Sequence, residues 1–147
     1  MPVFELVAVN DYTELDICKS IRRKVFMEEQ GVEESLEIDG FDVIGGSCRH
    51  YFATVDGISV GTCRVMDKGE GKAKLQRFCV LREYRGKGLG RFMLERLEEI
   101  CRGNGFARME MGAQCHAVPF YEKCGYKVVS GVFMDAGIKH VKMEKHL

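Results

Sequence analysis

The segment 82–91 has the residue types and the spacing of a turn that binds an anion. Three glycines alternate with other residues, and Arg85, Lys87 and Arg91 add positive charge. Glycine lets a backbone approach a ligand closely, and the first N–H groups of a helix lack acceptors and carry a partial positive charge. Because an apolar run precedes this segment and a helical pattern follows it, we predict a phosphate-binding turn rather than a turn with solvated charges.

The glycine spacing excludes the two commonest nucleotide-binding turns. A Walker loop needs Ser or Thr after its lysine, whereas Gly88 follows Lys87. A dinucleotide-binding turn needs Gly-x-Gly-x-x-Gly in an early strand–helix–strand unit. Here Gly86, Gly88 and Gly90 are evenly spaced, and three predicted strands precede the strand–helix–strand unit that contains them. We therefore expect the turn to bind the phosphate of another class of ligand.

The elements that must position this turn alternate between strands and helices, without a repeat or a linker. Asp11 and Glu14 have capping-box spacing, and Asp56-Gly57 suits a type I′ hairpin turn. The pattern predicts strands over 3–9, 51–55, 58–66, 73–81, 106–111, 126–130 and 138–145, and helices from Asp11 to Gly31, from Leu89 to Asn104 and from Pro119 to Cys124. Such an order indicates a mixed sheet with helices on both sides.

Three segments, one apolar and two charged, lead to predictions about their burial and exposure. The apolar run Phe78–Leu81 is typical of a strand that is buried on both faces. The run Arg22–Lys24 is expected to be a solvated basic face of the first helix. The acidic connection 31–47 could be a disordered surface loop or a segment that faces a substrate.

Length and charge limit the classes of function. The chain has 147 residues, which predicts a single domain over 1–147. Lys and Arg together number 22, and Asp and Glu also number 22, so there is no global positive field for nucleic acid or an anionic membrane. No apolar stretch is long enough to span a bilayer. We therefore expect no nucleic acid and no membrane as partners.

The seven cysteines are an odd number, and none of them form a Cys-x-x-Cys pair. A disulfide framework would favour an even number in a secreted chain, and the first residues lack a signal-peptide pattern. We therefore expect free, mostly buried thiols in a reducing cytoplasm. Cys115, His116 and Cys124 could bind zinc with a distant partner, but they lack the close paired spacing of zinc sites, and we expect no metal.

Two motifs resemble those of the GNAT superfamily of N-acetyltransferases. The segment 85–90 matches its coenzyme A pyrophosphate turn, R/Q-x-x-G-x-G/A, and the segment 120–126, Phe-Tyr-Glu-Lys-Cys-Gly-Tyr, is similar to its F-Y-E-K-x-G-F signature. Segments 21–32, 37–42 and 133–140 resemble the ElaA/YjcF-like bacterial branch. The resemblance thus covers nearly the whole chain.

This resemblance implies a fold and an activity. The fold would be α/β (α+β), with a mixed, mostly antiparallel central sheet of about six to seven strands flanked by helices on both faces. The activity would be transfer of the acetyl group of acetyl-CoA, as cosubstrate, to the primary amine of a small-molecule or peptide acceptor. A homodimer through edge strands is possible. The alternative is a non-catalytic acyl-CoA-binding or regulatory module.

The resemblance also implies site residues. Tyr121 would donate a proton to the leaving thiolate, although composition alone favours a packed aromatic there. The backbone N–H of Val80 would contact the thioester oxygen, and Gln114 would contact the cofactor at the end of its strand. The strand and the turn would bind the remainder of the cofactor through Phe78, Cys79, Val80, Arg85, Gly86, Lys87, Gly88, Leu89, Gly90 and Arg91.

The general base stays open at this stage. Some members of the superfamily carry a carboxylate on the strand before the turn, but residues 73–77 of this chain contain none. The candidates are an ordered water or one of five side chains: Glu28, Glu29, Glu110, His116 and His140. For His140, a half-buried strand histidine is as good an interpretation as a base.

Overall fold

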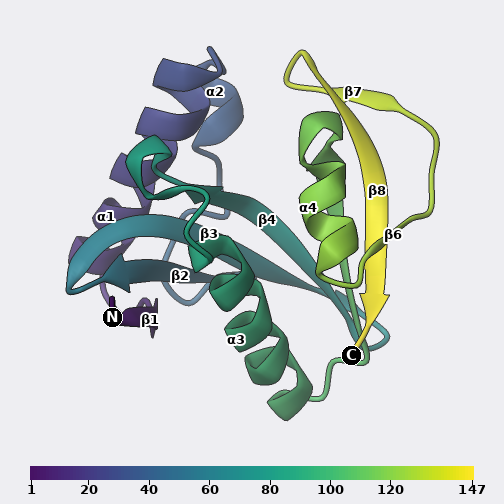
Figure 1. Ribbon diagram of the computed structural model, residues 1–147, viewed down its shortest axis with the longest axis horizontal. Coiled ribbons are helices and arrows are strands. Elements are labelled where there is room, and N and C mark those ends of the chain that lie inside the picture. The colour runs from purple at the N-terminus through teal and green to yellow at the C-terminus, as the bar shows by residue number, and fades with distance from the viewer.

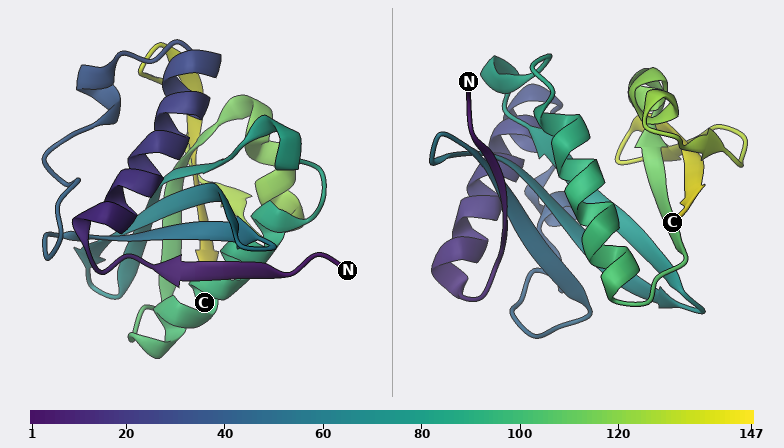
Figure 2. Two further views of the ribbon diagram at one scale, coloured as in Figure 1. Left: turned by 90° about the vertical axis from the view of Figure 1, so that its left-hand side faces the viewer. Right: turned by 60° about the horizontal axis from the view of Figure 1, so that its bottom comes forward.

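The computed structural model describes all 147 residues and contains one mixed sheet of eight strands with helices on both faces (Figures 1 and 2). The elements are β1 (Phe4–Ala8), α1 (Tyr12–Arg22), the π-helix η1 (Arg23–Glu29), α2 (Glu34–Glu37), β2 (Cys48–Val55), β3 (Ile58–Gly69), β4 (Lys72–Val80), the 3-10 helix η2 (Arg82–Tyr84), α3 (Leu89–Gly103), β5 (Arg108–Gln114), the 3-10 helix η3 (Cys115–Ala117), α4 (Val118–Lys123), β6 (Lys127–Val128), β7 (Phe133–Asp135) and β8 (Ile138–His146). The predicted fold class is confirmed. The sheet has one more strand than the expected upper number, because β7 is too short to produce a periodic pattern.

The sheet divides into two halves that separate at β4 and β5. Its order is β1-β2-β3-β4-β5-β8-β6, with β7 paired to β8, and only β4 and β5 run parallel. Their ladder spans only Lys72–Leu75 of β4. Beyond it, β4 continues to Val80 and β5 to Gln114 without pairing to each other, so the two halves diverge (Figure 1). The unpaired strand edges border the site described below.

A β-bulge lies in β4 where the two halves separate. Gln76 pairs with Arg64 and Cys79 pairs with Thr62, so Arg77 and Phe78 together oppose one residue of β3. Arg77 has a φ of +54°, which is uncommon for a residue other than glycine. The extra residue changes the alternation of side chains, so Leu75 and Phe78 both face the α3 and α4 side.

The expectation that Phe78–Leu81 is buried on both faces is wrong. Cys79 is buried against Ile21 and Val25, whereas Phe78 and Val80 are only partly buried. Phe78 packs against Phe120 and Tyr121 of α4, but both Phe78 and Val80 border the opening between the two halves, so this face is only partly covered. The apolar run here therefore marks a strand that borders an opening, and not a fully enclosed one.

Local turn and cap signals were predicted correctly. The Asp11 carboxylate accepts a hydrogen bond from the Glu14 N–H at 2.8 Å, and the Glu14 carboxylate accepts one from the Asn10 N–H at 2.8 Å. Asp56 and Gly57 have φ values of +49° and +83°, as a type I′ turn requires. The first helix differs in one respect, because regular α-helix ends at Arg22 and the chain continues as a π-helix.

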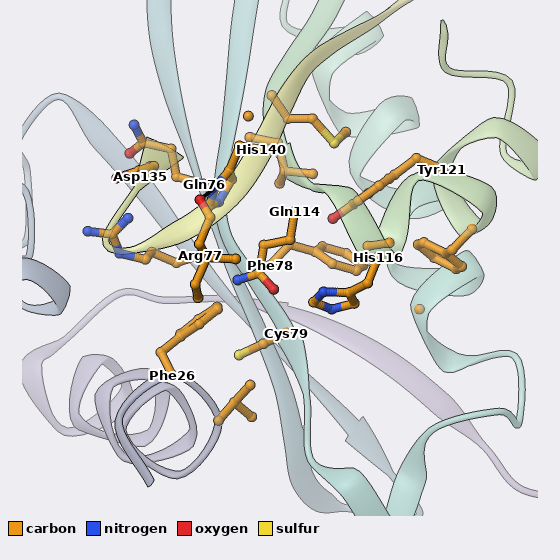
Figure 3. Close-up of a pocket in the computed structure, with 18 of the residues that line it drawn as sticks. Phe26, Gln76, Arg77, Phe78, Cys79, Gln114, His116, Tyr121, Asp135 and His140 are labelled. Carbon is orange, nitrogen blue, oxygen red and sulfur yellow. Dashed lines mark hydrogen bonds between the residues drawn. The ribbon is translucent and has the colours of Figure 1, made fainter. Parts of the chain in front are cut away.

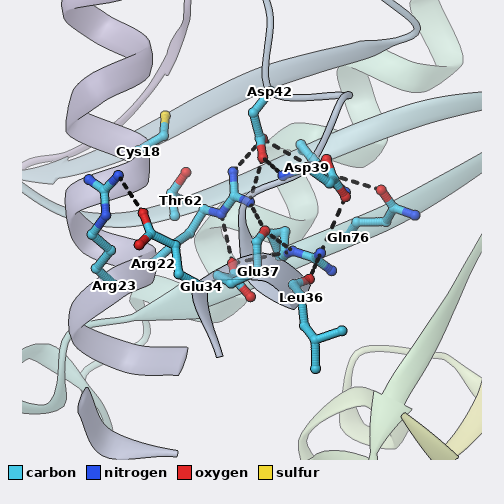
Figure 4. Close-up of polar contacts among 12 residues, drawn as sticks. Cys18, Arg22, Arg23, Glu34, Leu36, Glu37, Asp39, Asp42, Thr62 and Gln76 are labelled. Atoms are coloured by element: carbon cyan, nitrogen blue, oxygen red, sulfur yellow. Dashed lines mark hydrogen bonds and ion pairs between the residues drawn. The ribbon is translucent and has the colours of Figure 1, made fainter. Parts of the chain in front are cut away.

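The basic run and the acidic connection form a buried ion-pair network (Figure 4). Arg22 is 1% exposed, so the expectation of a solvated basic face is wrong for this residue. Its guanidinium contacts Glu37 at 2.8 Å and Asp42 at 2.6 Å. Arg64 reaches the same Asp42 carboxylate at 2.9 Å and Asp39 at 2.8 Å. The acidic connection is therefore neither a disordered loop nor, at Glu37 and Asp42, a source of free negative charge.

Two further findings concern the thiols and the helices. All seven cysteines are free, and five of them are buried. None of the helices combines the length and the apolar character that crossing a membrane requires.

Candidate active site

A cavity of about 1210 Å³ occupies the opening between β4 and β5 (Figure 3). Its walls come from both halves of the sheet. The first half contributes η1, α2, β4 and the turn before α3, and the second half contributes β5, α4, β7 and β8. The cavity therefore exists only because the two strands stop pairing after Leu75.

One end of the cavity is formed by the glycine-rich turn and the start of α3. No backbone N–H from Gly86 to Arg91 has a hydrogen-bond acceptor within the protein, and no side chain caps the helix. Gly88 has a φ of +88°, and a Cβ on Gly90 would lie 3.1 Å from the Phe120 ring. The sequence therefore folds into a cradle of free N–H groups, which is the arrangement that binds phosphate.

The charged residues of this turn are engaged within the protein. The Arg85 guanidinium donates to both Glu29 oxygens, at 2.9 and 2.8 Å, and its Nε donates to the Val80 carbonyl at 2.8 Å. These hydrogen bonds from Arg85 lower the pKa of Glu29. Arg91 pairs with Glu95 at 3.0 Å.

Most of the turn residues predicted to bind the cofactor line the cavity, but two of them do not. Arg85, Gly86, Gly88, Gly90 and Arg91 are among the lining residues. Lys87 does not line the cavity, and the Leu89 side chain lies in the hydrophobic core. The core position of Leu89 anchors the first turn of α3, and thereby holds its N–H groups at the cavity.

The end of β4 offers an open backbone edge to the cavity. The Leu81 N–H donates to the Val60 carbonyl at 2.8 Å. Because paired residues of an antiparallel ladder alternate in the direction of their backbone groups, the N–H and C=O of Val80 point away from β3. The Val80 carbonyl accepts the hydrogen bond from Arg85, and its N–H has no partner within the protein.

Phe78 and Cys79 lie on opposite faces of this strand. The Phe78 ring lies 6.2 Å from that of Phe120 and 6.1 Å from that of Tyr121. Cys79 lines the cavity, but burial raises the pKa of its thiol well above the ordinary value. At neutral pH this thiol is therefore protonated and a poor nucleophile.

Tyr121 is both a packed aromatic and a cavity group. It is 7% exposed, and its ring packs against those of Phe78, Phe120 and Tyr126. The hydroxyl has no hydrogen bond within the protein, and Figure 3 shows it directed toward the middle of the cavity. Burial raises the pKa of Tyr121 above its ordinary value, so the hydroxyl stays protonated at neutral pH and above.

Gln114 makes a contact that the sequence did not predict. Its side-chain amide and that of Gln30 exchange two hydrogen bonds, at 3.0 and 2.9 Å. Gln30 follows η1 in the first half of the sheet, and Gln114 ends β5 in the second half. The pair therefore spans the opening, and no periodicity or motif in the sequence marks Gln30 for this contact.

His140 is the candidate base with the most specific surroundings. It lies on β8 directly opposite Gln114, and its ring stacks on that of Phe133 at 5.8 Å. Its Nδ1 lies 2.7 Å from the Ile138 carbonyl. Since a carbonyl can only accept, Nδ1 carries the proton in the neutral ring, and Nε2 keeps a lone pair.

The other candidate bases are less well placed. Glu110 lines the cavity but pairs with Lys142 at 3.3 Å, and His116 is an exposed residue of the cavity wall. Glu28 and Glu29 do not line the cavity. No group of three or more His, Cys, Asp or Glu side chains is arranged to hold a metal ion.

Together these groups suit an extended, anionic ligand with a reactive centre in the middle of the cavity. Free N–H groups receive an anion at one end, and the open edge of β4 can pair with an amide-containing chain. Tyr121 of α4 can donate a proton, and His140 of β8 can accept one; both belong to the second half and line the same opening (Figure 3). Such an arrangement can transfer a group between two ligands that enter from different sides.

Comparison with known proteins shows the family and the fold of this chain. A family model described as the acetyltransferase (GNAT) domain matches residues 8–147. The Bacillus subtilis protein named uncharacterized N-acetyltransferase YjcF is 36% identical over 85% of this chain and 87% of its own length. Escherichia coli ElaA has the same fold, with a TM-score of 0.83, 24% identity and 99% of each chain covered. An aminoglycoside 6′-N-acetyltransferase, whose structure was solved with coenzyme A, is 18% identical with a TM-score of 0.78, covering 98% of this chain and 96% of its own.

Proposed function

Because this chain belongs to the GNAT acetyltransferase family, we propose that it transfers the acetyl group of acetyl-CoA to a primary amine of a small molecule or peptide. The observation that carries this proposal is the row of unpaired N–H groups from Gly86 to Arg91, which opens into the cavity beside the free edge of β4. The acceptor amine would attack the thioester directly, so no covalent enzyme intermediate is needed.

The phosphate cradle and β4 fit the two parts of coenzyme A. The N–H groups of residues 86–91 would hold the pyrophosphate, with Arg85 and Arg91 close by. The C=O of Val80 would accept a hydrogen bond from a pantetheine amide, as a neighbouring strand would. Bound acetyl-CoA supplies an activated acetyl thioester, and the protein orients it.

Three groups of the chain would handle the charge and the protons. The Val80 N–H would donate to the thioester oxygen as negative charge develops there. Nε2 of His140 would accept a proton from the attacking amine, because its Nδ1 is already committed to Ile138. Tyr121 would donate its proton to the departing thiolate, which its free hydroxyl directed into the cavity supports.

The proposal is tested by two measurements on the wild-type protein. Calorimetry gives the affinity for acetyl-CoA, and thiol release from acetyl-CoA is followed with a panel of amines and peptides. Binding together with amine-dependent release of coenzyme A supports an acetyltransferase. Binding without acceleration by any acceptor would instead support the non-catalytic acyl-CoA-binding module, and lack of binding would overturn both.

A further inference from the structure

His140 lies on the face of the sheet opposite to the one that α3 covers. On β5, Met109, Met111 and Ala113 belong to the core that α3 covers, so Glu110, Gly112 and Gln114 point to the opposite face. Their partners on β8, His140 and Lys142, share that face because directly opposed residues lie on the same side of a sheet. An acceptor that reaches His140 therefore enters from the face of η1 and α2, away from the phosphate cradle.

Apolar side chains line both sides of this entrance. We call the side with η1 and α2 the first bank and the side with the β7–β8 hairpin the second bank. Figure 1 shows α2 and the β7–β8 hairpin facing each other across the opening. From the first bank, Phe26, Val32 and Leu36 line the cavity, and Leu36 is 54% exposed. From the second bank, Phe133 and Ile138 line it, and Phe133 is 40% exposed.

The Phe133 ring is fixed against the floor of the cavity. It stacks on His140 with ring centroids 5.8 Å apart, and a Cβ on Gly112 would lie 3.5 Å from its edge. Glycine at 112 therefore allows the ring to approach β5 closely. An apolar surface lies directly beside the proposed base.

The carboxylates of the cavity wall do not form a site for a polycation. Glu37 is held by Arg22 at 2.8 Å and Arg77 at 3.2 Å, and Glu110 pairs with Lys142. Asp135 is the one lining carboxylate without an ion pair. A polyamine would therefore lose the hydration of several ammonium groups without gaining matching partners.

No unpaired Lys or Arg side chain lies where it could bind an acceptor carboxylate next to the amine nitrogen. Lys74 and the more distant Lys68 line the cavity at the other end of β4, and Lys74 lies six residues before Val80, roughly 20 Å along the strand. The Arg77 guanidinium is taken up by the Leu36 carbonyl at 3.0 Å and by Glu37 and Asp39. Lys123 lies on α4, at the opposite face.

We propose that the acceptor is a primary monoamine that carries an aryl or branched alkyl group and no charge beside its nitrogen. The apolar group would lie between Leu36 and Phe133, and the nitrogen would lie beside His140. This inference rests on the proposed acetyltransferase activity and adds the class of acceptor. The inference follows from two observations: both banks of the entrance are apolar, and the ionic groups near the proposed base are already paired.

The test compares four amines at saturating acetyl-CoA by release of coenzyme A. Phenylethylamine and 3-methylbutylamine represent the proposed class, phenylalanine adds a carboxylate beside the nitrogen, and spermidine adds further ammonium groups. We expect kcat/KM for the first two to exceed that for the others by about tenfold or more, since an uncompensated charge costs at least 1.4 kcal/mol.

Variants then locate the acceptor. Leu36→Ala and Phe133→Ala should each raise KM for phenylethylamine about three- to tenfold, with unchanged acetyl-CoA affinity, because each removes part of an apolar contact. Met134→Ala is the matched control, since Met134 neighbours Phe133 and is exposed but does not line the cavity. Its KM should equal that of the wild type.

The outcomes separate this inference from the proposed function. If acetyl-CoA binds and spermidine or phenylalanine is the better acceptor, the acceptor class is wrong and the acetyltransferase activity stands. A wild-type KM in both bank variants would also overturn the class. If no amine accelerates thiol release, the activity fails, and the inference fails with it.

Discussion

At the scale of single residues, the proposed chemistry depends on protonation states that neighbouring groups impose. Burial keeps the Tyr121 hydroxyl protonated, and the Ile138 carbonyl holds the proton of His140 on Nδ1. The Tyr121 hydroxyl can therefore donate, and Nε2 of His140 keeps a lone pair that can accept. The tautomer of His140 cannot be read from residue type, because it depends on the acceptor beside the ring.

Replacing Tyr121 by Phe removes the donor and keeps the ring packing. We expect kcat to fall about 100-fold, as for loss of a general acid, with little change in the free energy of unfolding because the hydroxyl has no hydrogen bond in the protein. Steady-state kinetics and thermal unfolding measure these two effects.

Tyr126→Phe is the matched control for that variant. Its hydroxyl donates to Glu98 at 2.8 Å, so its loss should lower the free energy of unfolding by about 1–2 kcal/mol and leave kcat close to that of the wild type. An unchanged kcat in Tyr121→Phe would show that Tyr121 only packs.

Replacing His140 by Gln tests the base. We expect kcat/KM to fall about 100-fold, and the loss of activity on acidification that protonation of a base produces should disappear from the pH profile. His116→Gln is the control, because His116 lines the same cavity but is exposed. If only the His116 variant loses activity, the assignment of the base to His140 is wrong.

At the scale of elements, the buried ion pairs fix the connection 31–47 against α1 and the bulge of β4. Asp42 is shared by Arg22 and Arg64, and Arg77 at the bulge contacts Glu37 and Asp39. The network therefore holds the bank that carries Leu36. Removing one partner leaves a buried charge uncompensated, which lowers the free energy of unfolding.

Asp42→Asn should lower the free energy of unfolding by about 3 kcal/mol at neutral pH. Denaturant titration measures this loss. Glu34→Gln is the control from the same segment, because its ion pair with Arg23 is exposed and long, at 3.6 Å, and should contribute less than about 0.5 kcal/mol. Equal losses in the two variants would contradict the role of the buried network.

The same variant should change the pH dependence of stability. Burial raises the pKa of Asp42, but hydrogen bonds and charge from Arg22 outweigh it and lower the pKa well below the ordinary value. A lowered folded-state pKa stabilises the protein above the unfolded value, and this stabilisation is lost as pH falls below about 4. Burial raises the pKa of Glu37, so its contribution has the opposite sign. Asp42→Asn should thus be less sensitive to acid than the wild type.

At the scale of the whole molecule, the equal numbers of positive and negative side chains are also paired across distant parts of the fold. Arg85 of the phosphate turn is bound to Glu29 of η1, far away in sequence. This ion pair ties the turn to the helix that precedes Gln30, whose amide reaches the second half of the sheet. The positive charge of the turn is therefore partly neutralised before any anion binds.

Glu29→Gln should release the Arg85 guanidinium for the pyrophosphate. We expect acetyl-CoA to bind about two- to fivefold more tightly at low salt, the size of effect typical of one exposed ion pair. Calorimetry of the wild type and the variant measures this change. Glu28→Gln is the control, since Glu28 does not line the cavity and makes no ion pair. Weaker binding in Glu29→Gln would show instead that Glu29 holds Arg85 in its binding position.

The sequence by itself determined the local elements and the glycine-rich turn whose N–H groups stay unpaired. The alternation of Gly86, Gly88 and Gly90 before an apolar helical pattern identified the cradle, because backbone conformation and helix-end N–H groups are local properties. The Asp11 cap and the turn at Asp56-Gly57 were predicted for the same reason.

Only the tertiary structure decided which groups meet across the opening. The Gln30–Gln114 pair, the Arg85–Glu29 pair and the burial of Arg22 join residues far apart in sequence, so no local pattern records them. The incomplete burial of Phe78 likewise depends on where β4 and β5 cease to pair. Local propensity and residue spacing are properties of the sequence. Burial, side-chain pairing and pKa depend on which segments the fold brings together.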